Sequence, residues 1–410
     1  MDVIALLQEY ARAEPPEDVR AVMRLSLLDW AACGIAGHRD GVFAGWAGAL
    51  TAAGPATRFD GVSGAVAEAA LVNGTLSHAL DYDDTHFDHI GHPSVAVIPA
   101  ALAIAQAEGA SLDQMLDAAL VGAEASVAVG LWLGREHYQI GYHQTATAGA
   151  FGATVAACRL LELDDKAIGH ALGLCATMAS GLKSQFGTMG KPLNAGLAAR
   201  TGVEAALWAQ AGVTSSCDAL SGPLGFAETH CGARAHVAFA WRMGRVSHKF
   251  HACCHGLHAA LEAVRDVPLA AASDVVVHTH PRWMSVCNKP APDTGLGAKF
   301  SYVHVIAMAA HGHDTGDITA FSDACAQDPA LVRWRDRVQV VADDRLSEMQ
   351  AHVVVDGVSC THDLNAPLPL DARATRIHAK ARALVGARAD EIAQAIDADD
   401  LPSFAQLLTS

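Results

Sequence analysis

Apolar residues recur every three or four positions through residues 1–262, which is the spacing of helices that pack one face or more into a core. Ile4, Leu7 and Tyr10 form the first such stripe, and another follows Pro15-Pro16. Ser111 begins a Ser-x-x-Gln capping box, and Asp164 is a second helix N-cap. The segments expected to be helical after the first 54 residues are 62–80, 94–107, 111–133, 146–161, 164–180 and 193–211.

The pattern changes in the third quarter of the chain. Runs of β-branched residues at 274–279, 337–342 and 352–358 indicate strands, with helical spacing at 299–311 and 317–325 between them. An Ala/Arg-rich helical tail follows Pro367 and Pro369. We therefore predict a mainly α protein. A large all-helical domain comprises residues 1–262 with 385–410, and a smaller α+β domain comprises residues 263–384.

Composition narrows the class of partner. Hydrophobic residues make up 51% and charged residues 18% of the 410 residues, so much surface must be buried within the chain or against another copy. The net charge of −16 argues against nucleic acid, whose phosphates require a basic face, and against an anionic membrane. A small anionic molecule remains possible because its site needs only a few local cations.

The ten cysteines are scattered, without a CxxC pair, and no secretory start is present. We interpret them as reduced thiols of a cytoplasmic protein. No apolar run is expected to span a bilayer, since 95–107 is too short and 115–133 carries Asp117 and Glu124.

The segment 78–94 concentrates polar chemistry between apolar helices. Its acids and histidines are Asp81, Asp83, Asp84, Asp88, His78, His86, His89 and His92. Burying such groups is costly unless each finds a partner. Three interpretations stand on this segment alone: a solvated loop, a metal site in which His86, His89 and His92 recur every three residues, or an acid/base site.

Three further polar interruptions occur in apolar sequence. They contribute His143, Lys183 with Lys191, and Lys249 with His255 and His258. Lysines repel a metal, but they hold carboxylates and stabilise an enolate-like intermediate, while a histidine moves the proton. If the interruptions converge, they form a site for deprotonating an anionic carbon acid.

Each of these residues also has a structural explanation. His143 fits a hydrogen-bonding position at a helix N-terminus, and Lys191 fits a solvated first turn. Cys253 and Cys254 fit buried small apolar residues better than a metal pair. The chain has no Walker loop, no GxGxxG after a strand and no GxSxG, so nucleotide, nicotinamide and serine-hydrolase functions lack support.

Five separated blocks, spread over nearly the whole chain, resemble the MmgE/PrpD family. They are Asp81-Tyr-Asp-Asp-Thr85 with His92-Pro-Ser94, Gly-Tyr-His143, Gly187-Thr-Met-Gly-Lys191-Pro-Leu, Lys249 with Cys254 and His258, and Ala298-Lys-Phe-Ser-Tyr302 before Gly312. The family includes 2-methylcitrate dehydratase, cis-aconitate decarboxylase and iminodisuccinate epimerase. The resemblance implies a helical domain, an α+β lid, a homodimer and no required cofactor or metal.

The resemblance also implies site residues. Catalytic positions are Asp81, His92, His143, Lys191, Lys249 and Tyr302, the last from the lid. Substrate-binding positions are Thr85, Lys183, Lys191, Lys249, Cys254 and His258. Two departures bear on the reaction. By the resemblance, Cys254 stands where the decarboxylase has a histidine, and the Phe186-Gly-Thr-Met-x-Lys191 run is closer to that of the epimerase.

We expect an enzyme that abstracts a proton α to a carboxylate of a small di- or tricarboxylate. In this hypothesis Lys191 and Lys249 anchor carboxylates, and His92 and His143 form the acid/base pair. Dehydration and epimerisation rank ahead of decarboxylation. A competing hypothesis from another class is a metal-dependent hydrolase using Asp83, His86, His89 and His92. A third is a family member that binds carboxylates without catalysis.

Overall fold

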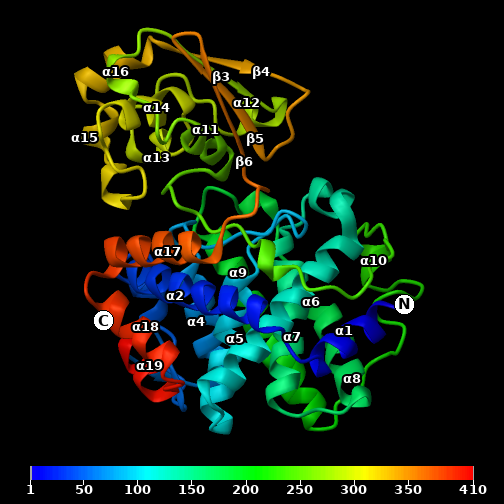
Figure 1. Ribbon diagram of the computed structural model, residues 1–410. Coiled ribbons are helices and arrows are strands. Elements are labelled where there is room, and N and C mark those ends of the chain that lie inside the picture. The colour runs from blue at the N-terminus through cyan, green and yellow to red at the C-terminus, as the bar shows by residue number, and fades with distance from the viewer. Residues whose placement is uncertain (1, 410) are drawn as a thin grey trace. The chain divides into compact units, whose positions relative to one another are not determined.

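The computed structural model describes residues 2–409 and is mainly helical, as predicted (Figure 1). The chain divides into two compact units. Unit 1 consists of Met1–His248 and Ile377–Ser410, and unit 2 consists of Lys249–Arg376. The chain thus leaves unit 1 once and returns to it once. The domain boundaries given from the sequence stay predictions.

Unit 1 is built from helices. They are α1 (Val3–Arg12), α2 (Glu17–Arg39), α3 (Ala44–Gly48), α4 (Val66–Ser77), α5 (Ser94–Glu108), α6 (Leu112–Ile140), α7 (Gln144–Leu160), α8 (Asp165–Met178), α9 (Gly190–Gln210), α10 (Phe226–Thr229), α18 (Arg388–Asp397) and α19 (Leu401–Leu408). The hairpin of β1 (Ala56–Thr57) and β2 (Ser63–Gly64) was not expected. Unit 1 also contains the 3₁₀ turns η1 (Lys183–Gln185) and η2 (Met243–Arg245). Helix α17 (Leu370–Val385) crosses from unit 2 into unit 1.

Small residues let the central helices α4, α5, α6, α7 and α9 approach closely. A Cβ atom at Gly152 of α7 would lie 2.5 Å from the Gly122 carbonyl oxygen of α6. A Cβ atom at Gly74 of α4 would lie 2.8 Å from the Gly196 Cα atom of α9. Neither position accepts a larger side chain without moving backbone, so the glycines set the helix spacing.

Local signals fixed several helix starts. Ser111 and Gln114 form the predicted capping box, and Asp164 accepts from the Ala167 backbone N–H. Helix α6 runs past the predicted end at 133, with a non-helical kink at Gly134. It is also long and apolar enough, by length and composition, to cross a membrane, which was not expected. However, 89% of its most apolar window is buried inside the structure.

Unit 2 contains a four-stranded sheet with strand order β4-β3-β5-β6. The strands are β3 (Val275–Thr279), β4 (Val338–Ala342), β5 (Gln350–Val355) and β6 (Val358–Asp363). β3 is parallel to β4 and antiparallel to β5. The predicted strand 352–358 was wrong in extent. Asp356 and Gly357, both with positive φ, turn the chain between β5 and β6.

The remaining elements of unit 2 are short. They are η3 (His255–Leu257), α11 (His258–Ala263), η4 (Leu269–Ala271), α12 (Pro281–Val286), α13 (Gly295–Ala298), α14 (Tyr302–Ala310), η5 (Ile318–Ala320), α15 (Asp323–Ala326) and α16 (Pro329–Arg335). The predicted helix 317–325 was wrong, because Ser322 caps a new helix after a 3₁₀ turn.

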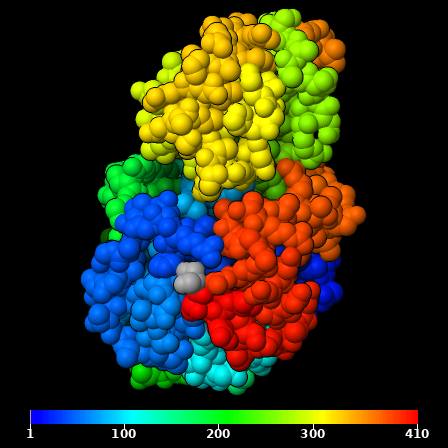
Figure 2. Space-filling view, turned by 90° about the vertical axis from the view of Figure 1, so that its left-hand side faces the viewer, coloured from blue at the N-terminus to red at the C-terminus, as the bar shows by residue number. Residues whose placement is uncertain are grey.

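The two ends of unit 1 pack together. Helices α18 and α19 contact α2, and the C-terminal surface adjoins the N-terminal surface in the space-filling view (Figure 2). Unit 1 is therefore completed by the last segment of the chain that the structure describes.

Candidate active site

Segment 78–94 connects α4 to α5 and is largely buried. His78, Asp83, Asp84, His89 and His92 are all less than one tenth exposed, so the solvated-loop interpretation is wrong for most of the segment. The chain turns at Asp81, whose φ of +51° lies in the left-handed region. Aspartate adopts this region more readily than most residues, which suits it to the turn.

Asp83 lies between two histidines. Its Oδ1 is 2.9 Å from His78 Nδ1, and its Oδ2 is 2.7 Å from His92 Nδ1. Burial alone raises the pKa of a carboxyl group, but the charges and hydrogen bonds of the two histidines outweigh it and hold the pKa of Asp83 well below its ordinary value. The charge of a carboxylate 2.7 Å away favours a proton on His92 Nδ1 and leaves Nε2 to accept one.

The opposite nitrogen of His92 faces an ion pair. His92 Nε2 is 3.4 Å from Asp81 Oδ1, and the same oxygen is 2.7 Å from Lys191 Nζ. Lys191 is in the first turn of α9, directly after the Gly187–Gly190 segment. The side chains of Asp81 and Lys191 are 43% and 17% exposed, so this pair is the solvent-reachable part of the cluster.

His143 is the N-cap residue of α7 and is buried. Its Nδ1 is 3.3 Å from Asn194 Nδ2, which can only donate, so the neutral ring carries its proton on Nε2. Burial and then the charge of Lys191 hold the pKa of His143 well below its ordinary value. Its ring centroid is 6.1 Å from that of His78 and 5.0 Å from that of Phe186.

Asn194 and His78 were not predicted in these roles from the sequence. Asn194 was not singled out, although it follows Lys191 by three residues and so shares its helix face. His78 was recognised as part of the polar segment but not as a partner of Asp83. Asp83 was counted in the polar segment under all three interpretations, but an individual role was given to it only in the metal-hydrolase alternative.

The ligand set of the alternative metal-hydrolase hypothesis does not come together, because His86 and His89 are directed elsewhere. His89 Nε2 bonds Ser126 Oγ at 2.8 Å, and burial lowers the pKa of His89 to about 3. His86 Nε2 bonds the Arg242 carbonyl oxygen. Among residues 2–409, the ligand-type atoms within 4.8 Å of one another belong to His78, Asp81, Asp83 and His92.

That second set is better explained as an acid/base cluster than as a cation site. Both Asp83 oxygens face histidine nitrogens, and the Lys191 ammonium already neutralises Asp81 at 2.7 Å. A metal ion bound to Asp81 would lie next to the Lys191 ammonium, and two positive charges that close repel strongly in a partly buried site.

Two other predicted binding residues of unit 1 have structural contacts. Thr85 pairs with Ser247 through both backbone groups, at 2.9 and 2.8 Å. Lys183 Nζ donates to the Tyr138 carbonyl oxygen at 2.9 Å and lies 3.9 Å from the Tyr138 ring centroid. These contacts place Lys183 at the end of α6, and its substrate-binding role stays a prediction.

The remaining predicted residues belong to unit 2. Lys249 and His258 are buried, and Cys254 is partly exposed. The Tyr302 hydroxyl is fully buried, donates to the Gly256 carbonyl oxygen at 2.6 Å and is 2.8 Å from Thr279 Oγ1. These bonds favour a packing role for Tyr302, and the predicted catalytic contributions from unit 2 stay predictions.

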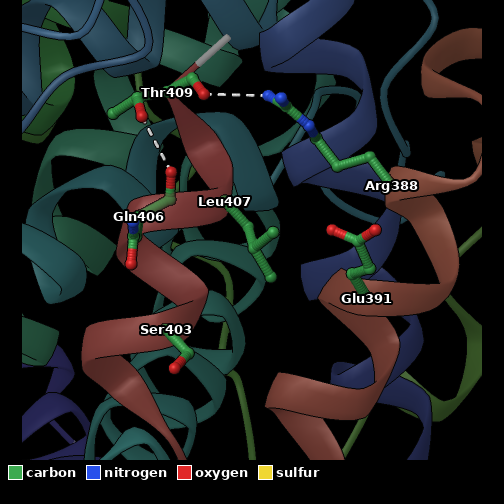
Figure 3. Close-up of a pocket in the computed structure, with 6 residues that line it drawn as sticks. All are labelled: Arg388, Glu391, Ser403, Gln406, Leu407 and Thr409. Atoms are coloured by element: carbon green, nitrogen blue, oxygen red, sulfur yellow. Dashed lines mark hydrogen bonds between the residues drawn. The ribbon is translucent and has the colours of Figure 1, made fainter.

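A surface groove lies elsewhere in unit 1. A groove of about 500 Å³ between α18 and α19 is lined by Arg388, Glu391, Ser403, Gln406, Leu407 and Thr409 (Figure 3). Arg388 Nη1 bonds the Thr409 carbonyl oxygen across it. The groove contains no histidine, and its one carboxylate, Glu391, has no lysine or histidine among the lining residues, so the chemistry of the Asp81–His92 cluster makes that cluster the better candidate site.

The fold and the cluster define the class: a mainly helical protein in which Asp83 and His92 are buried beside the partly exposed Asp81–Lys191 ion pair. Residues 4–238 match the MmgE/PrpD N-terminal domain, and residues 251–398 match the MmgE/PrpD C-terminal domain. The chain therefore belongs to the MmgE/PrpD family, as the sequence blocks indicated.

Similar curated proteins carry the name cis-aconitate decarboxylase. The protein from Aspergillus terreus is 29% identical over 223 residues, 48% of this chain and 45% of its own length. The human protein is 33% identical over 165 residues, 38% of this chain and 34% of its own length, and the Mus musculus protein is 32% identical over 165 residues, 38% and 33%. The chain thus matches less than half the length of these relatives.

Proposed function

We propose that this chain is a cofactor-independent enzyme that removes a proton from the carbon α to a carboxylate of a small di- or tricarboxylate. One observation carries the proposal. A lysine ammonium and a histidine Nε2 meet at the same Asp81 oxygen, and Asp83 stands behind that histidine. The lysine supplies the charge that attracts a carboxylate, and the histidine supplies the base.

The geometry supports a role for each residue. His92 is the base, because Asp83 orients its Nδ1 proton and stabilises the imidazolium that forms. Lys191 anchors a substrate carboxylate and stabilises the enolate-like charge. His143, neutral with its proton on Nε2, donates to a substrate oxygen. When the substrate binds, its carboxylate replaces Asp81 as the partner of Lys191, and Asp81 then assists the proton transfer.

The fate of the carbanion decides the reaction. Loss of β-hydroxide gives dehydration, and return of the proton to the other face gives epimerisation. Decarboxylation requires that the proton first return to another carbon of an unsaturated substrate, after which CO₂ leaves and the electron pair left on carbon takes up a proton. We propose dehydration or epimerisation because of the residues found around Lys191 and at Cys254. The names of the relatives favour cis-aconitate-type decarboxylation as the second candidate.

The test is NMR in D₂O with a panel of citrate-, aconitate-, malate- and aminosuccinate-type acids. We expect deuterium at a carbon next to a carboxylate, and the accompanying product names the reaction. The Lys191→Met variant should lose this exchange, and Lys166→Met, which removes an exposed lysine of the same unit, should keep it.

Two results would count against the proposal. If Lys191→Met exchanged the α proton at the wild-type rate, Lys191 would not anchor the substrate carboxylate. Exchange with no acid, together with hydrolysis that appears only on adding a divalent metal, would replace carbon-acid chemistry by metal-dependent hydrolysis.

We also propose that the enzyme is a homodimer in the cytoplasm. Large apolar side chains are 39–48% exposed along η1, the following turn and α9, a surface that a second copy would cover. They are Leu182, Phe186, Met189, Leu197 and Trp208. Light scattering on the wild type and a Leu197→Glu/Trp208→Glu variant tests this. A monomeric wild type would refute it.

A further inference from the structure

A buried lysine from the C-terminal end of the chain holds the loop that carries Asp81 and Asp83. Lys380 belongs to α17, and its side chain is 3% exposed. Its Nζ is 2.6 Å from Asp29 Oδ1 of α2 and 2.6 Å from the Tyr82 carbonyl oxygen. It also lies 4.0 Å from the Tyr82 ring centroid. All these residues belong to unit 1.

Tyr82 is the residue between the two functional carboxylates. Asp81 precedes it and bonds Lys191, and Asp83 follows it and contacts His78 and His92. Fixing the Tyr82 carbonyl fixes the peptide plane from which Asp83 continues. The left-handed φ of Asp81 makes this loop a conformation that needs support from its surroundings.

The Lys380 ammonium also lies near buried acids, among them Asp29 and Asp83. Asp29 and Asp83 both favour its charged form, and the pKa of Lys380 is raised although burial opposes this. Asp84, the next residue of the loop, accepts from Ser94 Oγ at 2.6 Å, and burial raises its pKa to about 7. Without Lys380, Asp29 would lose this ion pair, and the loop would lose its bond at Tyr82.

We propose that Lys380, paired with Asp29, is a positioning residue that holds the Asp81–Asp83 loop so that Asp83 can orient His92. The inference rests on the proposed function and deepens it. Lys380 reaches the loop through the Tyr82 backbone, 298 residues away in sequence, and acts on the base only through Asp83.

The test is Lys380→Met, which keeps the apolar stem and removes the ammonium. The matched control is Arg20→Met, which breaks another ion pair of α2, that of Arg20 Nη2 with Asp117 Oδ2 at 2.6 Å. In Lys380→Met we expect kcat for α-proton exchange to fall about 10-fold or more with KM within about 3-fold. The control should change neither.

A second measurement does not need a substrate. In ¹⁵N-histidine-labelled protein, His92 should show its proton on Nδ1 in the wild type and in Arg20→Met. In Lys380→Met the His92 and His78 ring signals should move and the Nδ1–H form of His92 should decrease. Because this readout is independent of turnover, it tests the positioning role even if no carboxylate reacts and the proposed function fails.

If Lys380→Met does not fold, the double variant Asp29→Asn/Lys380→Met removes both charges of the pair and is measured in its place. A folded single or double variant with unchanged His92 signals and unchanged kcat overturns the inference. A variant whose Tm falls as in Arg20→Met, with no change of the histidine signals, also overturns it, because the pair would then act on stability alone.

Discussion

Replacing Asp83 by asparagine tests the central contact of the site. The change keeps the shape of the side chain and removes its charge. An asparagine amide also donates to His92 Nδ1, and this would force the ring proton onto Nε2, where the base must be unprotonated. Both effects act on the same step, so we expect a loss of kcat with a smaller change of KM.

The magnitude follows from the geometry. At 2.7 Å, the distance from Asp83 Oδ2 to His92 Nδ1, two opposite unit charges interact by about 6 kcal/mol at an effective dielectric constant near 20. Removing one partner of a buried pair typically costs about 3–5 kcal/mol after relaxation. A loss of about 3 kcal/mol from the imidazolium-forming step lowers kcat by roughly 100-fold.

The assay is α-proton exchange or product formation measured beside thermal unfolding. Asp117→Asn is the control, because Asp117 pairs with Arg20 away from the histidines. A kcat within about 3-fold of the wild type in a folded Asp83→Asn variant would refute the reasoning, since neither orientation nor charge would then matter.

The same residue predicts a pH effect on stability. The pKa of Asp83 is depressed in the folded state, so its contribution is present above the unfolded-state pKa near 4 and is lost as pH falls through the lower folded value. The Tm difference between wild type and Asp83→Asn should therefore shrink below about pH 4.

Three further changes have defined outcomes. Lys191→Met should lower kcat/KM by roughly 100-fold yet change stability by less than about 1 kcal/mol, because its ion pair is partly exposed; a Tm loss without a rate loss would contradict this. Asn194→Ala should lower kcat about 10-fold by releasing the ring of His143, and an unchanged rate would show that the ring is held by packing. Glu124, with a pKa raised to about 7 by burial, binds its proton more tightly when folded. The contribution of Glu124 to stability should therefore fall as pH rises from about 4.5 to 7, and Glu124→Gln should flatten the slope of Tm against pH in this range. An unchanged slope would show that other acids cause it.

The sequence predicted much of unit 1 because its signals are local. Helical spacing, the Ser111 capping box and the Asp164 cap act within a few residues, and the structure confirms them. The strand 352–358 was misplaced because Val355 and Val358 are both β-branched, and only the Asp356-Gly357 turn separates two strands.

The candidate site was predictable in its residue types but not in its pairing. That His92 and Lys191 meet at one Asp81 oxygen follows from how α9 lies beside the loop, which no local pattern contains. Likewise, the three-residue repeat of His86, His89 and His92 predicts convergence only in a helix. The chain turns at Ile90, with φ of +54°, so His89 is directed to Ser126 instead.

The pairing of Asp29 with Lys380 bears on the order in which the protein is made. Asp29 leaves the ribosome early, but its buried cation is synthesised only after all of unit 2. Until α17 appears, packing α2 against the Asp81–Asp83 loop would bury the Asp29 carboxylate without this cation. The nascent N-terminal helices should therefore stay loosely packed and dependent on chaperones, and the loop should reach its working conformation only when the last helices of unit 1 close around it.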